Sequence, residues 1–197
     1  MVKTGKLRAG VVTRTAEDWE EAALDAIAAD GVGSVAVPEL ARTLGVTKGS
    51  FYWHFTSLQS LIDKALQRWE KADEMVLAQV GEIADARQRL VALFQEAMHQ
   101  QRAHALYITL ATSASPHVSA ALRRVSERRM KFLIAAYRDL GMSSKQALDR
   151  ARLTYAAYIG LLHLRRQSLP GLRTAGDVDG FLAQAVETLI PATPRRK

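Results

Sequence analysis

One short segment, ARTLGVTKGSFYWHF (residues 41–55), constrains the fold of this chain more than any other part of the sequence. Gly45 separates two short helical patterns, and glycine readily takes the left-handed conformation needed in a turn between two steeply packed helices. Thr47 stands where its hydroxyl can cap the second helix. The residues after it are dense in hydrogen-bond donors and aromatic rings: Lys48, Ser50, Tyr52, Trp53 and His54. The pattern predicts a helix-turn-helix whose second helix enters the DNA major groove.

The residues before this segment predict the rest of a three-helix headpiece, which we define as residues 15–56. The sequence TAED from Thr15 is typical of a capping box, and the helix that it opens should stop at Gly31. Pro38 lies where the first turn of a second helix tolerates proline. We expect a small apolar centre built from Leu24, Ile27, Leu40, Leu44, Val46, Phe51 and Phe55.

The stretch from about Trp19 to Leu66 resembles the N-terminal domain of TetR-type transcriptional regulators. The resemblance is carried by AALDAIAADG, ELARTLGVTKGSFYWHF and SLIDKAL, in the expected order and with the expected gaps. It implies that Phe51 and Phe55 belong to the core. It also implies that a set of residues around the second helix supplies phosphate and base contacts: Arg42, Thr47, Lys48, Gly49, Ser50, Tyr52, Trp53 and His54.

Helical periodicity continues to the end of the chain and predicts an all-α protein of about nine helices. Ser57 should cap a long helix from about Leu58 to Val80, and the buried stripe of this helix is expected to be Leu61, Ala65, Leu66, Trp69, Ala72, Met75 and Val76. Further helices should start near Asp85, Ala105, Ser115, Ser143 and Asp177. The expected organisation is a flexible basic arm (1–14), a helix-turn-helix domain (15–56), a helical ligand-binding and dimerisation domain (57–192) and a basic tail (193–197).

The charge distribution does not by itself indicate DNA binding. The chain has a formal net charge of +7, but residues 1–70 hold eight Lys and Arg against nine Asp and Glu. The excess therefore lies in the C-terminal part, where the run Arg123–Lys131 is expected to be a solvated helix face. The alternative is a flank that favours an acidic ligand or nearby DNA. Basic residues of the arm, Lys3, Lys6, Arg8 and Arg14, are candidates for phosphate contacts, and a solvated tail is the alternative.

Two C-terminal helices have the pattern of a subunit interface. Ala156 and Gly160 are four residues apart, so their small side chains lie on one helix face and allow close approach of another helix. The last helix has an apolar stripe comprising Phe181, Leu182, Ala185, Val186 and Leu189. We expect these helices to form a four-helix bundle in a two-fold homodimer, which would present two headpieces to a near-palindromic DNA site. The alternative is that both helices cover the core of a monomer.

The resemblance further implies a small molecule bound among the C-terminal helices, where it lowers affinity for DNA. Such a site should be mainly apolar with a few polar groups. The candidates are the aromatic, methionine and histidine residues Trp69, Phe94, Met98, His104, Tyr107, Tyr137, Tyr155 and Tyr158. The alternative is that each of these is ordinary core or surface.

Catalytic and metal motifs are missing from the sequence. It has no glycine-rich phosphate loop, no nucleophile elbow and no HExxH pattern, so neither an enzyme nor a bound metal or cofactor is expected. The chain also has no cysteine, which fits a reducing cytoplasm. The most apolar run, Leu153–Leu164, is too short to span a bilayer, so no membrane partner is expected.

These features predict a dimeric, sequence-specific transcriptional regulator, with a repressor released by a small molecule as its specific form. A different class remains open: a helical, dimeric protein-interaction module with weak or lost DNA binding. The near-neutral headpiece favours this alternative. So does Leu58, because related regulators often carry a basic residue at the start of the fourth helix.

Overall fold

The computed structural model describes residues 13–99, 101–167 and 175–191, with side chains omitted at 98–104 and 175. Within these ranges it confirms the all-α prediction, and no strand is present. The elements are α1 (Ala16–Asp30), η1 (Val32–Ser34), α2 (Val37–Leu44), α3 (Lys48–Phe51), α4 (Leu58–Gly81), α5 (Ala86–His99), α6 (Gln101–Ala111), α7 (Pro116–Asp139), α8 (Ser144–Arg166) and α9 (Ala175–Leu189). Here η1 is a short 3-10 turn that the sequence analysis did not anticipate.

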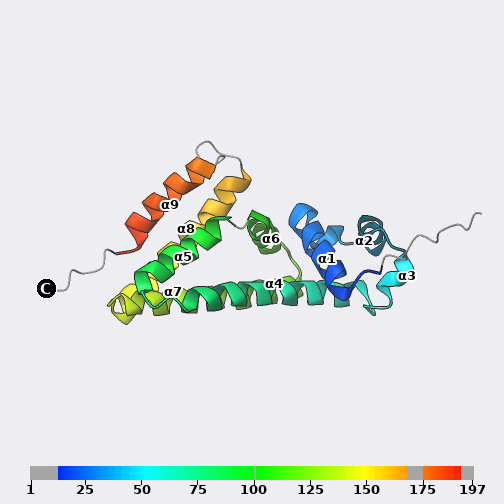
Figure 1. Cartoon of the computed structure of the whole chain (residues 1–197), viewed down its shortest axis with the longest axis horizontal. Coiled ribbons are helices and arrows are strands. Elements are labelled where there is room, and N and C mark those ends of the chain that lie inside the picture. The colour runs from blue at the N-terminus through cyan, green and yellow to red at the C-terminus, as the bar shows by residue number, and fades with distance from the viewer. Residues whose placement is uncertain (1–12, 100, 168–174, 192–197) are drawn as a thin grey trace, which may run out of the picture.

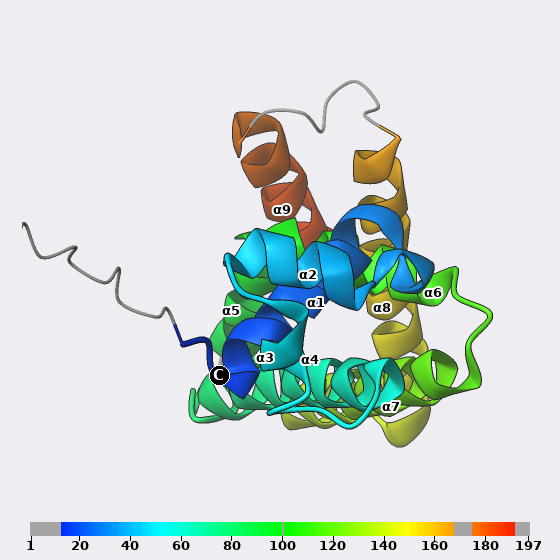
Figure 2. The same ribbon diagram turned by 90° about the vertical axis from the view of Figure 1, so that its right-hand side faces the viewer.

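Helix α4 connects the two ends of the molecule (Figure 1). Its N-terminal end lies beside α3, and its C-terminal part runs alongside α7, with α5, α8 and α9 above this pair in the view. Helix α1 packs on both α4 and α6, so the headpiece rests on the rest of the chain along two helices. Viewed from the headpiece end, α2 and α3 face outward while α8 and α9 project to one side (Figure 2).

Side-chain caps determine where three of the helices begin. Thr15, Ser57 and Ser143 each accept a hydrogen bond from the backbone N–H three residues later, and each is part of a reciprocal capping box. The predicted starts of α1, α4 and α8 are therefore confirmed. A cap of this kind contributes about 1 kcal/mol, because it satisfies N–H groups that have no partner within the helix.

The structure corrects two local expectations. Thr47 occupies the cap position of α3 but makes no side-chain capping bond; its backbone carbonyl instead accepts from the Ser50 N–H at 3.0 Å, which closes a tight turn. Helix α3 then ends at Phe51, and Tyr52, Trp53 and His54 continue as turns rather than as helix. On α4, Ala72 and Met75 were expected in the buried stripe but are exposed, because the helix extends past the headpiece and is covered there on fewer sides.

The main apolar core runs without a break from the headpiece into the rest of the chain. Trp19 and Ile27 of α1 are completely buried against residues of α4, α6 and α7. Polar contacts reinforce the junction: Arg68 of α4 donates to Glu20 at 3.1 Å, and the Thr109 hydroxyl donates to the carbonyl of Ala28 at 3.4 Å. A displacement of α4 or α6 should therefore also displace the headpiece, because close-packed interiors have low compressibility and transmit strain.

The turn before α3 provides a test of backbone strain. Gly45 has φ +69°, and no atom lies within 4 Å of the place where a Cβ would stand. Gly45→Val should therefore lower the free energy of unfolding by about 1–3 kcal/mol through backbone strain alone, as measured by urea denaturation. Gly33→Val is the matched control, because Gly33 also has open space around it but no positive φ. Equal losses at the two positions would contradict the assignment of the turn.

Candidate nucleic-acid interface and interior cavity

The segment around α3 presents polar and aromatic side chains to solvent. Tyr52 and Trp53 are 68% and 87% exposed, although large aromatic side chains usually lie in the core. Lys48 and His54 are exposed beside them, and Ser50 is half-buried. Thr47 and Gly49, also predicted contacts, lie exposed in the same stretch. The structure thus brings the predicted set together on one convex end of the molecule, at α2 and α3 (Figure 2).

Buried aromatic rings hold this segment in place. Phe51 is buried, with its ring edge-on to Trp19 at 5.5 Å between centroids and stacked on Phe55 at 5.5 Å. A helix of four residues cannot maintain itself, because forming a first helical turn costs more than it returns. The orientation of the exposed side chains therefore depends on Phe51 and Phe55. Both residues are buried, which confirms the prediction.

Two arginines near the turn are engaged within the headpiece. The Arg14 Nε donates to the carbonyl of Leu44 at 3.0 Å, at the C-terminal end of α2, where a positive charge suits the helix dipole. Arg42 forms an exposed ion pair with Glu39 at 2.8 Å. Leu58 packs its side chain against the core at the start of α4. Lys3, Lys6 and Arg8 lie outside the described residues.

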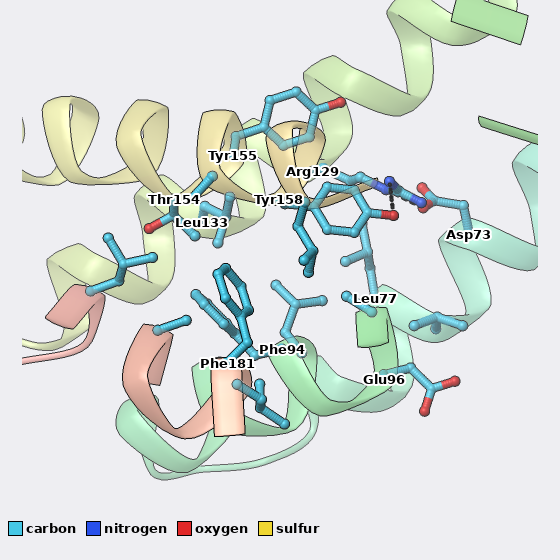
Figure 3. A pocket seen from close by; sticks show the side chains of 18 of the residues that line it. Asp73, Leu77, Phe94, Glu96, Arg129, Leu133, Thr154, Tyr155, Tyr158 and Phe181 are labelled. Atoms are coloured by element: carbon cyan, nitrogen blue, oxygen red, sulfur yellow. Dashed lines mark hydrogen bonds and ion pairs between the residues drawn. The ribbon is translucent and has the colours of Figure 1, made fainter. Parts of the chain in front are cut away.

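A cavity of about 190 Å³ opens between α4, α5, α7, α8 and α9 (Figure 3). Most of its wall is apolar: Trp69, Ala72, Val76, Leu77, Leu93, Phe94, Ala97, Leu133, Ala157, Leu161, Phe181, Leu182, Ala185 and Leu189. The polar lining residues are Asp73, Glu96, Arg129, Thr154, Tyr155 and Tyr158. An apolar hollow with a few polar groups is the usual form of a small-molecule site.

An ion pair closes one side of this cavity. The Arg129 Nε donates to Asp73 Oδ1 at 2.6 Å, and its Nη1 donates to the Tyr158 hydroxyl at 3.3 Å (Figure 3). Burial disfavours the charge on Arg129, but Tyr158 and Asp73 outweigh it and raise the pKa of the guanidinium. Arg129 therefore stays positively charged at the edge of an apolar space.

Tyrosine hydroxyls form a network behind the wall. The hydroxyl of Tyr155 lies 2.7 Å from that of Tyr107 and donates to Ser126 at 2.9 Å. Burial is the main cause that raises the pKa of Tyr155, so its hydroxyl remains protonated at neutral pH. On the other side of α8, the hydroxyls of Tyr137 and Thr154 are 2.6 Å apart. These bonds fix the side chains of α8 against α6 and α7.

The candidate ligand residues divide into three groups. Trp69, Phe94, Tyr155 and Tyr158 line the cavity, whereas Tyr107 and Tyr137 lie behind the wall, each bonded to a lining residue. The side chains of Met98 and His104 fall outside the described part of the chain.

Asp73 and Arg129 were missed because the run Arg123–Lys131 was interpreted as a solvated face. In the structure Arg128 and Arg129 of that run turn inward to Asp73. A signal existed in the sequence: Glu70 and Asp73 share one helix face, as do Arg124 and Arg128.

Comparisons with known proteins agree with this geometry. Residues 21–65 match the family model described as bacterial regulatory proteins, tetR family. The structure is similar to that of a TetR transcriptional regulator from Legionella pneumophila, with TM-score 0.76, 16% identity and coverage of 91% of this chain and 99% of the other. A transcriptional regulator from Rhodococcus sp. Rha1 is similar with TM-score 0.72 and 21% identity, and the match covers 89% of this chain and 96% of the other. A Saccharomonospora viridis protein in complex with choline is similar with TM-score 0.71 and 21% identity, and the match covers 86% of this chain and 92% of the other.

The headpiece is that of the TetR family. The matched residues run from within α1 to the first turns of α4, and so they contain every DNA contact predicted around α2 and α3. Over the rest of the chain, the similarity to these solved structures is one of fold. The predicted resemblance is confirmed.

The predicted subunit-interface residues lie on two different surfaces of this TetR-type fold. Ala156 and Gly160 are exposed on α8, on the same face as Leu153, which is 57% exposed, and Leu164. On α9, by contrast, Phe181, Leu182, Ala185 and Leu189 line the cavity, and Val186 packs against Leu90 and its neighbours. The exposed side of α9 carries Gly176, Asp179, Gly180, Ala183 and Glu187.

Two further classes of site are absent from residues 13–99, 101–167 and 175–191. No group of three or more His, Asp or Glu side chains there has the geometry to hold a metal ion. No helix in the same ranges is both long enough and apolar enough to cross a membrane.

Two substitutions in the headpiece test which ring near α3 is packed in the core and which is exposed to solvent. Phe51→Ala should lower the free energy of unfolding by about 3–5 kcal/mol, because it removes a buried ring. Trp53→Ala should change it by no more than about 0.5 kcal/mol, because that ring is in solvent. Both are measured by urea denaturation followed by circular dichroism. A large loss for Trp53→Ala would mean that the ring is packed and unavailable to a partner.

Proposed function

We propose that this protein is a dimeric, sequence-specific transcriptional regulator, and that it acts as a repressor released from a near-palindromic operator by a small molecule. The observation that carries the proposal is the exposed set Lys48, Tyr52, Trp53 and His54 on a TetR-type helix-turn-helix. Tyr52 and His54 touch buried rings on one side, but all four side chains remain exposed to solvent. They match the needs of a surface that contacts phosphates and base edges in a major groove.

The roles of the individual contacts follow from their chemistry. Lys48 supplies a positive charge at the start of α3 and suits a phosphate or a guanine edge. Thr47, Ser50 and Tyr52 offer hydroxyls for phosphate oxygens, and Gly49 allows close approach of the backbone. Trp53 and His54 extend the contact surface beyond the helix. Arg42, which is paired with Glu39, provides a supporting DNA contact from α2.

We assign dimerisation to the outward faces of α8 and α9. Leu153 and Leu164 expose apolar surface at the ends of a stripe whose middle is Ala156 and Gly160. The outward face of α9 also carries the small residues Gly180 and Ala183, between the charged Asp179 and Glu187, so a second copy can approach both helices closely. Two copies then present two headpieces related by a dyad, which matches the symmetry of a near-palindrome.

The cavity is the proposed effector site, within residues 57–192. It touches α4, which carries the headpiece at its other end, so a change at the cavity has a direct mechanical route to the DNA surface. The similar Saccharomonospora viridis protein was determined in complex with choline, a small molecule. A ligand releases DNA only if it prefers the conformation that does not bind the operator.

Selection from random DNA followed by a salt titration tests the function as a whole. The expected result is an enriched near-palindrome whose affinity falls steeply with salt, because phosphate contacts release counterions. Recovery of no sequence by an intact dimer would contradict the proposal and favour a protein-interaction module. Reporter assays with the enriched site upstream and downstream of a promoter then separate repression from activation.

Substitutions at Lys48 and Tyr52 test the assigned surface. Lys48→Ala should weaken operator binding and lower the salt dependence by about one counterion if Lys48 contacts a phosphate. Tyr52→Phe should weaken binding by losing one hydroxyl contact. Neither should alter the melting temperature, because both side chains are exposed. Lys71→Ala, which removes an exposed charge from the middle of α4, is the matched control and should bind DNA as the wild type does.

Gly160→Leu tests the subunit seam. No atom lies within 4 Å of the added Cβ, and leucine favours helix over glycine by about 1 kcal/mol, so the protomer should remain folded. The larger side chain should nevertheless hold the partner helix away and shift sedimentation toward the monomer. Gly160→Ala is the control and should remain dimeric. A Gly160→Leu protein that sediments as an unaltered dimer would place the seam elsewhere.

A further inference from the structure

The arginine cluster beside the cavity carries one positive charge more than its partner acids on α4. On α7, Arg124, Arg128 and Arg129 face α4, where Glu70 and Asp73 are the matching acids. Arg124 takes both oxygens of Glu70, at 2.6 and 2.8 Å. Asp73 is left to serve both Arg128 and Arg129, and its contact with Arg128 is long, at 3.5 Å. Within this cluster, two guanidinium groups thus share one carboxylate.

Arg129 retains hydrogen-bonding capacity toward the cavity that it lines. Its side chain is 18% exposed, Nε is bonded to Asp73, and Nη1 is bonded to Tyr158. Among the described residues, Nη2 donates no hydrogen bond. The guanidinium also lies over the rings of Tyr107 and Tyr158, 5.4 and 5.5 Å from their centroids, which leaves the edges of its plane for polar partners.

The other acid of the wall does not balance this charge at close range. Glu96 comes from α5, and its carboxylate is directed away from the Arg129–Asp73 pair (Figure 3). The space next to the pair is bordered instead by apolar side chains such as Leu77, Phe94 and Leu133. A positive charge beside an apolar, water-poor hollow attracts an anion more strongly than it would in water.

We propose that the effector is a small organic acid, with its carboxylate bound by Arg129 and its apolar body enclosed by the cavity. This inference rests on the proposed function of the cavity as the effector site. A carboxylate fits the planar edge of a guanidinium, and the resulting charge-assisted bonds are stronger than those to a neutral group. A cationic ligand would meet the like charge of Arg129. The cavity volume, about 190 Å³, is below the roughly 300–1,000 Å³ typical of drug-sized ligands, so the acid is small.

The same geometry gives the acid a direct effect on α4. Asp73 lies on that helix and is almost completely buried, at 6% exposure of its side chain. An incoming carboxylate competes with Asp73 for Arg129, and it weakens the contact that holds α4 to α7. Arg129 thus pairs either with the carboxylate of the bound acid or with Asp73 of α4. Binding of the acid weakens the contact between α4 and α7, and loss of the acid restores it.

Calorimetric titration of the full chain with three probes of similar shape tests the ligand class. The probes are phenylbutyrate, phenylbutyramide and phenylbutylamine, which differ in carrying an anionic, a neutral and a cationic head. Phenylbutyrate should bind at least about tenfold more tightly than either analogue, because only its head pairs a negative charge with the positive charge of Arg129. Equal or tighter binding of the amide or the amine would overturn the proposal, as would no detectable binding of phenylbutyrate at millimolar concentration.

Two substitutions that break the same ion pair should have opposite effects. Asp73→Asn removes the competing anion and should tighten phenylbutyrate binding, whereas Arg129→Gln should abolish the preference for the acid. A merely structural pair would give losses in both variants, which would refute the exchange. Arg129→Lys keeps the charge and provides a second measurement if Arg129→Gln does not fold; it should still prefer the acid to the amine.

These titrations contain no DNA, so their outcome is separate from that of operator selection. A protein that selects an operator but prefers phenylbutylamine keeps the proposed function and loses the acid. A protein that binds phenylbutyrate through Arg129 but selects no operator keeps the acid and loses the regulator.

Discussion

The packing of Phe51 against Trp19 is the contact on which the proposed DNA-contact surface depends. Helix α3 is a single turn of four residues, and such a helix has no stability of its own. Its position is set by burying the Phe51 ring edge-on to Trp19 and flat against Phe55. The next residues, Tyr52 and Trp53, then have no room in the core and extend into solvent. The buried ring and the exposed rings are thus two results of one packing arrangement.

Helix α4 links this surface to the cavity, and arginine pairs fasten its middle to α1 and to α7. Near the headpiece, Arg68 bonds to Glu20 of α1; further along, Asp73 bonds to Arg129 of α7. These contacts are partly buried, so loss of one partner leaves a charge with little compensation. A cavity that borders one of these pairs is well placed to alter how α4 is held. The proposed control of DNA binding by a ligand therefore requires only a change in how α4 is held.

Exposed large hydrophobic residues mark the two surfaces to which partners are assigned. Within the described residues they are Tyr52 and Trp53 beside α3, Leu153 and Leu164 on α8, and Met75 on α4. The first pair lies on the proposed DNA surface and the second on the proposed subunit seam. Exposed apolar clusters of this kind are usually covered by a partner in the functional assembly.

The sequence alone determined the helices and the headpiece, because these depend on residues that are close together in the chain. The helix starts at Thr15, Ser57 and Ser143 and the turn at Gly45 depend on local signals, and each appears where it was predicted. Burial of Phe51 and exposure of Trp53 also followed from local spacing and family resemblance. The end of α3 at Phe51 did not, because it depends on a tight turn closed by a backbone carbonyl rather than by the Thr47 hydroxyl.

Tertiary structure decided what the C-terminal helices enclose. Periodicity identifies the apolar stripe of α9 but not its neighbour, so only the packed structure directs Phe181 toward the cavity. In the same way, a run of arginines resembles a solvated face until α4 brings Asp73 against Arg129. That pair joins residues 56 positions apart, and such a contact is set by how helices pack, which no local pattern specifies.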